Sequence, residues 1–203
     1  MEAVVSEHVM SHHEQLEAAS SERVMFGFWL YLMTDLLMFA VLFACYSVLH
    51  GNNVGSPAAN ALYSLPAALH ETLILLTSSF TCGIAMVYAR RGNKNMTLLL
   101  FGITFILGLL FLKLELSEFS ALVHDGYSLQ TNAFLSSFFV LVGTHGLHIT
   151  AGLLWMAITL IFVMKRGLNA PLLRKLSLLS LFWHFLDIVW IFIFTIVYLG
   201  AYI

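Results

Sequence analysis

The sequence predicts an all-α membrane protein, a polytopic bundle of five transmembrane helices. Of its 203 residues, 60% are hydrophobic and only 10% are charged, and the mean hydropathy is +0.90. A soluble domain carries about 25% charged residues. Several apolar runs reach the roughly 20 residues that a helix needs to cross the hydrocarbon core. They are far longer than the ~10 residues of a barrel strand, and they do not alternate polar with apolar positions.

The chain divides into a polar tail, residues 1–23, and a transmembrane bundle, residues 24–203. The tail is rich in glutamate and histidine and lacks the basic start and short apolar stretch of a cleavable signal, so the first apolar run is expected to be a signal anchor. A net charge of −2, with no basic stripe, excludes a nucleic-acid-binding protein. The expected membrane spans lie near 24–49, 68–89, 96–119, 133–164 and 177–202.

The distribution of lysine and arginine beside these spans predicts the orientation. The connections at 50–67 and 120–132 and the C-terminus contain neither residue type. The basic residues beside the other helix ends are Arg23, Arg90, Arg91, Lys94, Lys165, Arg166, Arg174 and Lys175. By the positive-inside rule, we expect a cytoplasmic N-terminus and a periplasmic or external C-terminus. No internal repeat is visible, which argues against an inverted-repeat transporter.

Ionisable side chains inside the spans are the candidate functional residues. An arginine, lysine or aspartate costs about 2.5–3.5 kcal/mol at the centre of a membrane helix on translocon scales, so each ionisable side chain there requires a partner or a function. The candidates for a buried polar network, or for lipid or subunit contacts, are Asp35, Glu71, Lys113, Glu115, Glu118, His145, His148, His184 and Asp187.

Spacing sorts these candidates, since residues three or four apart share a helix face. Three pairs follow, Glu115 with Glu118, His145 with His148, and His184 with Asp187. Lys113 points away from Glu115, because two residues rotate a helix by roughly 200°. We expect it to pair with Glu71 or with a lipid phosphate. The depths of the candidates in the membrane suggest two separate clusters and no continuous relay.

Three interpretations of these residues are open. Histidines are the commonest metal ligands, but the patterns His-x-x-His and His-x-x-Asp do not match the Glu-x-x-His motifs of a di-iron bundle. A chain of acids and imidazoles can also carry protons. The interpretation we favour is structural, with polar groups bonding between helices and holding the bundle in register.

Small and aromatic residues are expected to have structural roles. Small residues let helix backbones approach closely. Those on the second and fourth spans are Ser78, Ser79, Cys82, Gly83, Gly143, Gly146, Thr150, Ala151 and Gly152. Aromatic side chains are expected at lipid-facing and interfacial positions. Examples are Trp155, Trp183, Trp190, Tyr198 and Tyr202.

Three sequence strings carry a family resemblance. They are Ser117-Glu118-Phe119, Gly143-Thr144-His145-Gly146-Leu147-His148, and Trp183-His184-Phe185-Leu186-Asp187-Ile188-Val189-Trp190. Together with Thr34-Asp35 on the first span, they resemble subunit III of haem–copper respiratory oxidases, over nearly the whole chain from about Phe26. Many cytochrome c oxidase members have seven helices, and the first two are missing here. The chain is therefore most similar to the five-helix subunit III of cytochrome bo-type ubiquinol oxidases, which also begin with a histidine-rich tail.

The resemblance implies a non-catalytic component of a proton-pumping ubiquinol oxidase in the bacterial cytoplasmic (inner) membrane. Such a subunit holds no haem, copper or other metal and no catalytic residue of its own. Haem and copper are expected in subunit I, and the implied partners are subunits I and II, a small subunit IV and phospholipids. The implied roles are assembly, lipid binding and support of proton uptake by subunit I. The alternatives are subunit III of a cytochrome c oxidase and an independent small ion or proton transporter.

Overall fold

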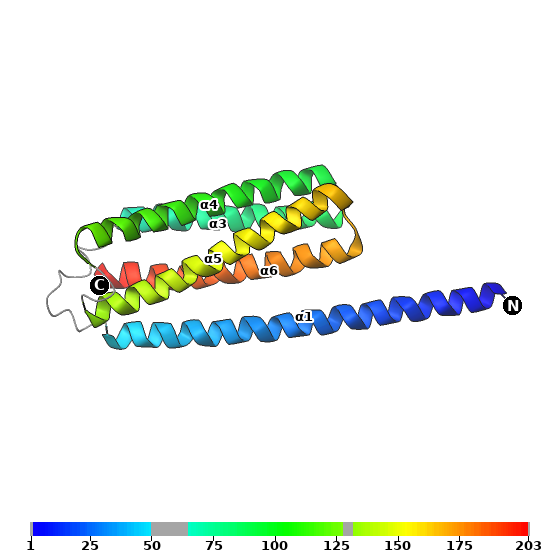
Figure 1. Ribbon diagram of the computed structural model, residues 1–203, viewed down its shortest axis with the longest axis horizontal. Helices are drawn as coiled ribbons and strands as arrows, with labels where there is room; N and C mark the ends of the chain where they lie inside the picture. The colour runs from blue at the N-terminus through cyan, green and yellow to red at the C-terminus, as the bar shows by residue number, and fades with distance from the viewer. Residues whose placement is uncertain (1, 50–64, 128–131, 203) are drawn as a thin grey trace. The chain divides into compact units, whose positions relative to one another are not determined.

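The described part of the chain folds into long helices. A computed structural model describes residues 2–49, 65–127 and 132–202, and within these the side chains of 22–49, 65–127 and 132–201. The helices are α1 (Glu2–Leu49), α3 (Leu65–Arg90), α4 (Lys94–His124), α5 (Ala133–Arg166) and α6 (Ala170–Ile193), followed by a π-helix, η1 (Phe194–Leu199), and a 3₁₀ turn, η2 (Gly200–Tyr202) (Figure 1). Within these described residues, five segments are long and apolar enough to cross a membrane. The predicted all-α, five-span fold class is confirmed.

The chain forms two units, residues 1–37 and residues 38–203. Helix α1 belongs to both, and its candidate membrane span is Glu22–Leu49. The helix itself begins at Glu2, so the polar tail is helical backbone continuous with this span. The predicted boundary between the polar tail, residues 1–23, and the transmembrane bundle, residues 24–203, stays a prediction.

Asparagine caps set where three of the helices begin. The side-chain oxygens of Asn93, Asn132 and Asn169 each accept a hydrogen bond from the backbone N–H three residues later, at 3.2, 2.8 and 3.0 Å. These bonds satisfy one of the donors that a helix start leaves without an intrahelical acceptor. Helix α6 therefore begins at Ala170, before the predicted start near 177, with Pro171 in its first turn, where a missing N–H costs least.

Helices α3 to α6 pack as a ring of four, in which α3 contacts α4 and α6, and α5 contacts the same two helices. The α3–α4 and α5–α6 connections are tight turns at one end of this ring, and Gly92 and Gly167 reverse the chain there with φ of 74° and 72°. Such positive φ values suit glycine because it has no Cβ.

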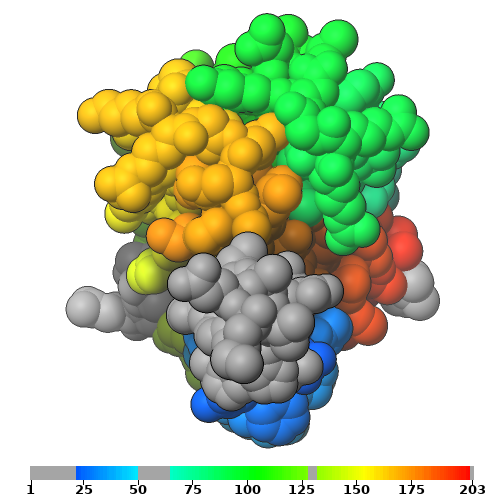
Figure 2. Space-filling model, turned by 90° about the vertical axis from the view of Figure 1, so that its right-hand side faces the viewer, coloured from blue at the N-terminus to red at the C-terminus, as the bar shows by residue number. Residues whose placement is uncertain are grey.

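Figure 2 views this end, where the beginning of α4, in green, adjoins the end of α5 and the beginning of α6, in orange. Lys94 Nζ donates to the carbonyl oxygen of Met164 across the two connections, at 2.9 Å. We call this the basic end, because its residues include Arg90, Arg91, Lys94, Lys165, Arg166, Arg174 and Lys175.

Aromatic residues of α6 and η1 form much of the core, which corrects the expected lipid-facing and interfacial placement. Trp183, Trp190 and Tyr198 are at most 1% exposed. The indole N–H groups of the two tryptophans donate to the hydroxyls of Ser78 and Thr72 on α3, each at 3.1 Å. A buried indole needs such an acceptor, and α3 supplies one at both depths.

The small residues mark close approaches at some positions only. Ser78 and Cys82 of α3 are buried, and a Cβ at Gly152 would lie 3.1 Å from the Phe182 ring. Thr150 and Ala151 are exposed, so the prediction that they lie between helices is wrong within this chain.

Candidate functional site

Three glutamates and one tyrosine gather at the end of the ring opposite the basic end. This carboxyl cluster consists of Glu71 on α3, Glu115 and Glu118 on α4, and Tyr198 on η1. Tyr198 donates its hydroxyl to Glu118 Oε2 at 3.1 Å. Glu71 interacts electrostatically with both Glu115 and Glu118. The predicted Glu115–Glu118 face thus meets two further helical segments.

Two of these carboxyl groups are almost completely enclosed. Glu71 is 3% exposed and Glu115 is 2% exposed. The Glu115 carboxyl group lies over Gly146 of α5, where an added Cβ would be 3.0 Å from both of its oxygens. Among the described residues, no group hydrogen-bonds either Glu115 oxygen or Glu71 Oε2. Burying polar atoms in this way is costly, so the cluster is held together by the surrounding packing.

Lys113 lies outside the carboxyl cluster. Its side chain is exposed, on a different face of α4 from the buried Glu115, as the spacing predicts. Glu71 interacts with Glu118 and Glu115 instead, and within the described part of the chain it forms no ion pair with Lys113. The other predicted partner of Lys113, a lipid phosphate, stays a prediction.

The His145–His148 pair sits among aromatic rings. His145 is fully buried, with ring centroids 6.0 Å from Phe111 and 5.2 Å from Trp190. The ring of Phe39 lies 5.4 Å from that of His148. His148 Nδ1 is hydrogen-bonded to the carbonyl oxygen of Thr144 at 2.7 Å. This arrangement packs the two imidazoles against rings and a backbone carbonyl.

The His184–Asp187 pair is joined by a residue of another helix. Ser79 Oγ of α3 is hydrogen-bonded to His184 Nδ1 at 2.6 Å and also to the Asp187 carboxyl group. Asp187 is 7% exposed, whereas His184 is only half-buried. The three side chains therefore link α3 to α6.

Asp35 belongs to the other unit, residues 1–37. Its carboxyl group shares a hydrogen bond with the side chain of Tyr31, one helical turn earlier. Across the described residues, no group of three or more histidine, cysteine, aspartate or glutamate side chains is arranged to hold a metal ion.

Comparison with known proteins agrees with this architecture. The family profile described as cytochrome c oxidase subunit III matches residues 2–202. The chain belongs to this family. It is 48% identical over 192 residues to the cytochrome bo(3) ubiquinol oxidase subunit 3 of Pseudomonas aeruginosa, covering 95% of this chain and 92% of that protein.

The names of other relatives include both electron donors, quinol and cytochrome c. The probable quinol oxidase subunit 3 of Staphylococcus saprophyticus is 44% identical, covering 85% of this chain and 87% of that protein. The cytochrome c oxidase subunit 3 of a Bacillus species is 46% identical, covering 85% of this chain and 84% of that protein. As a subunit III, the chain is one component of an oxidase with several subunits.

Among the described residues, the strings that carry the resemblance to this subunit III family supply three of the buried polar side chains, Asp35, His145 and Asp187. The string from Gly143 to His148 places His145 in the core and Gly146 under the Glu115 carboxyl group. The string from Trp183 to Trp190 provides both indole donors and the residues that bind Ser79. The family motifs thus coincide with contacts between helices.

Sequence reasoning missed three partners, Ser79, Tyr198 and Gly146. Ser79 and Gly146 were recognised only as small residues. The sequence around a serine or a glycine does not indicate which side chain of another helix lies opposite it. Tyr198 lies in a π-helix, whose wider turn changes the residue spacing, so its face cannot be derived from a period of 3.6.

Proposed function

We propose that this chain is the cofactor-free subunit III of a proton-pumping quinol oxidase in a bacterial cytoplasmic membrane. The observation that carries the proposal is the 48% identity, over 95% of the chain, to a protein named ubiquinol oxidase subunit 3. Relatives from Staphylococcus and Bacillus are also named quinol oxidase subunit 3 or probable quinol oxidase subunit 3. The haem and copper of the enzyme would lie in subunit I, and subunit II and a small subunit IV would complete the assembly.

The chain's own role in this proposal is structural. Some of its polar residues bond between helices, as Tyr198 does to Glu118 and Ser79 does to His184. Interhelical hydrogen bonds of this kind contribute about 0.6 kcal/mol each on average in membrane proteins. They would keep the bundle in one register, so that it offers a fixed surface to subunit I, binds phospholipids and supports proton uptake.

A second candidate is subunit III of a cytochrome c oxidase. The 46% identity to a Bacillus protein of that name favours it. Both candidates share the cofactor-free role of this chain, and they differ in the electron donor that the other subunits accept.

The test is purification of the assembly from native membranes through a tag on this chain. We expect haem-bearing chains to co-purify, and oxygen consumption to be supported by ubiquinol but not by reduced cytochrome c. Consumption with cytochrome c alone would favour the second candidate. Intact-mass spectrometry would count the companion chains and identify subunits I, II and IV.

The chain purified alone provides the decisive contrast. We expect no haem absorption and no stoichiometric copper or iron. A bound haem or metal would overturn the cofactor-free role, and proton or ion flux through vesicles containing only this chain would favour the independent transporter. Reporter fusions at each terminus test the expected cytoplasmic N-terminus and periplasmic C-terminus.

A further inference from the structure

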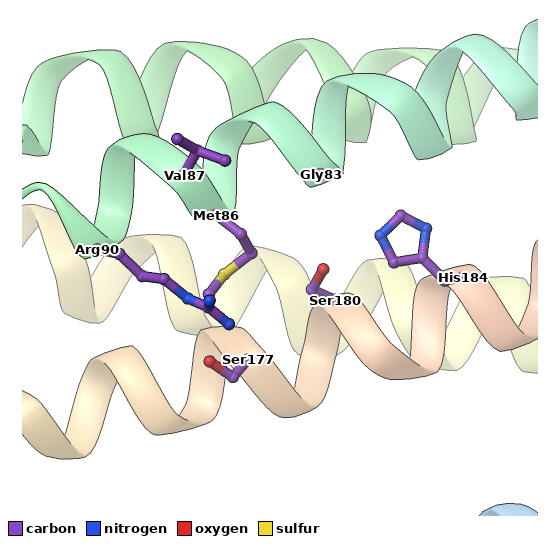
Figure 3. Close-up of a pocket in the computed structure, with 7 residues that line it drawn as sticks. All are labelled: Gly83, Met86, Val87, Arg90, Ser177, Ser180 and His184. Atoms are coloured by element: carbon purple, nitrogen blue, oxygen red, sulfur yellow. The ribbon is translucent and has the colours of Figure 1, made fainter.

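A groove runs along the seam between α3 and α6, on the outer surface of the ring. One part is a cavity of ≈ 260 Å³ between Arg90 and His184, lined from α6 by Ser177 and Ser180 (Figure 3). The second part, of ≈ 400 Å³, continues along α3 to Leu76. We call the whole depression, from Leu76 to Arg90 on α3 and from Ser177 to Asp187 on α6, the α3–α6 groove.

The two parts form one continuous groove because they share lining residues. Gly83, Val87 and His184 border both. From Leu76 to Arg90 the groove spans roughly 21 Å at the 1.5 Å rise of a helix. This length equals about two-thirds of the ~30 Å hydrocarbon core. The positive-inside rule predicts that the basic end lies at one edge of that core.

Polarity changes along the groove in a defined order. At the basic end, the Arg90 side chain extends from α3 toward Ser177 of α6 (Figure 3). Further from the basic end come the hydroxyl of Ser180 and the imidazole of His184. The innermost part is mostly apolar, with Phe80 68% exposed, and Ser79 and the Asp187 carboxyl group also border it.

Gly83 keeps the α3–α6 groove open beside His184. A Cβ on Gly83 would lie 3.9 Å from His184 Cε1 and Nε2, so any larger side chain would extend into the groove. His184 Nδ1 is already bonded to Ser79, which leaves Nε2 as the ring nitrogen on the side of Gly83. The groove therefore presents a polar atom at a depth where hydrocarbon would otherwise meet only apolar groups.

We propose that the α3–α6 groove binds one anionic phospholipid, with its phosphate on Arg90 and Ser177, its glycerol esters beside Ser180 and His184, and an acyl chain along the surface at Phe80. This inference rests on the lipid-binding role proposed above and assigns that role a site. Arginine suits a phosphate because its guanidinium group donates several hydrogen bonds in a planar fork.

Charge favours an anionic lipid such as phosphatidylglycerol over a zwitterionic one. Within the described part of the chain, Arg90 forms no ion pair with a carboxylate, and Arg91, Arg174 and Lys175 add positive charge at the same end. Among the described residues, the charged side chains at this end are all cationic, so the ammonium group of phosphatidylethanolamine would find no carboxylate there. A helix of a partner subunit fits less well, because the polar positions from Arg90 to His184 would face its apolar surface.

The experiment uses the purified assembly that contains this chain, in nanodiscs of equal parts phosphatidylglycerol and phosphatidylethanolamine. Native mass spectrometry measures the phosphatidylglycerol that stays bound to this chain. Arg90→Gln should lower its occupancy about five-fold, since one basic residue at a membrane surface contributes about 1 kcal/mol. The matched control, Arg91→Gln, makes the same charge change at the next residue, outside the groove, and should lower occupancy less than Arg90→Gln does.

A second pair of variants tests whether the lipid occupies the α3–α6 groove at Gly83. Gly83→Leu should displace the lipid by filling the groove, whereas Gly83→Ala, whose Cβ has room beside His184, should retain it. Equal occupancy in both variants, an equal loss in Arg90→Gln and Arg91→Gln, or a density map with a partner helix in the groove would overturn the proposal. A chain that retains phosphatidylglycerol but never co-purifies with haem would instead refute the proposed function and leave the groove assignment standing.

Discussion

Replacing Gly108 with alanine tests how the core of the ring is packed. Gly108 lies on α4, and an added Cβ would be 2.9 Å from Leu153 Cδ2 and from two atoms of the Trp183 ring. Ordinary contact begins at 3.4 Å, so these neighbours would have to move by about 0.5 Å. Trp183 cannot do so easily, because it is 1% exposed and its N–H donates to Ser78 Oγ at 3.1 Å.

The expected magnitude follows from these contacts. Overpacking a filled core costs about 1–3 kcal/mol, and weakening the indole hydrogen bond adds about 0.5–1.5 kcal/mol. Alanine in place of glycine recovers about 1 kcal/mol of helix propensity. We therefore expect Gly108→Ala to lose about 2 kcal/mol of stability.

The assay is thermal unfolding of the assembly in nanodiscs, followed by tryptophan fluorescence, together with the yield of this chain in the purified complex. Gly102→Ala is the matched control on the same helix, because no atom lies within 4 Å of its added Cβ. It should be neutral or slightly stabilising. Equal stability of the two variants would refute the packing argument.

Two further substitutions test the buried polar contacts. Tyr198→Phe removes the hydroxyl that donates to Glu118 and should destabilise the bundle by about 0.6–1.7 kcal/mol, measured as a lower unfolding temperature. An unchanged temperature would show that the bond contributes nothing. His184→Ala leaves Ser79 and Asp187 without the imidazole and should lower the yield or stability of the assembly more than its oxygen consumption per haem. A His184→Ala assembly of normal yield that lacks haem would contradict the structural role.

The length of the apolar runs was sufficient to predict the five spans, and helical spacing was sufficient to predict which residue pairs share a face. Glu115 and Glu118 do lie together, and His184 and Asp187 share Ser79. The start of α6 was wrong by several residues, because an asparagine cap begins the helix at polar positions that hydropathy assigns to a loop.

Long-range partners lay beyond sequence reasoning. The Trp190 indole donates to Thr72, 118 residues earlier in the chain, and no local spacing connects the two. The interfacial placement expected for Trp190 was wrong for the same reason. A tryptophan is stable at the membrane interface or in a core that offers an acceptor, and only the packing of α3 against α6 decides between them.

By itself, the sequence determined that this protein is a multi-pass helical membrane protein and pointed to its family, because hydropathy and contiguous motifs are properties of neighbouring residues. The tertiary structure decided which buried polar groups meet, that Gly146 lies under a carboxyl group, and that a groove opens from Arg90 past Gly83. Those features depend on the rotation and spacing of helices far apart in the chain, which side-chain packing sets.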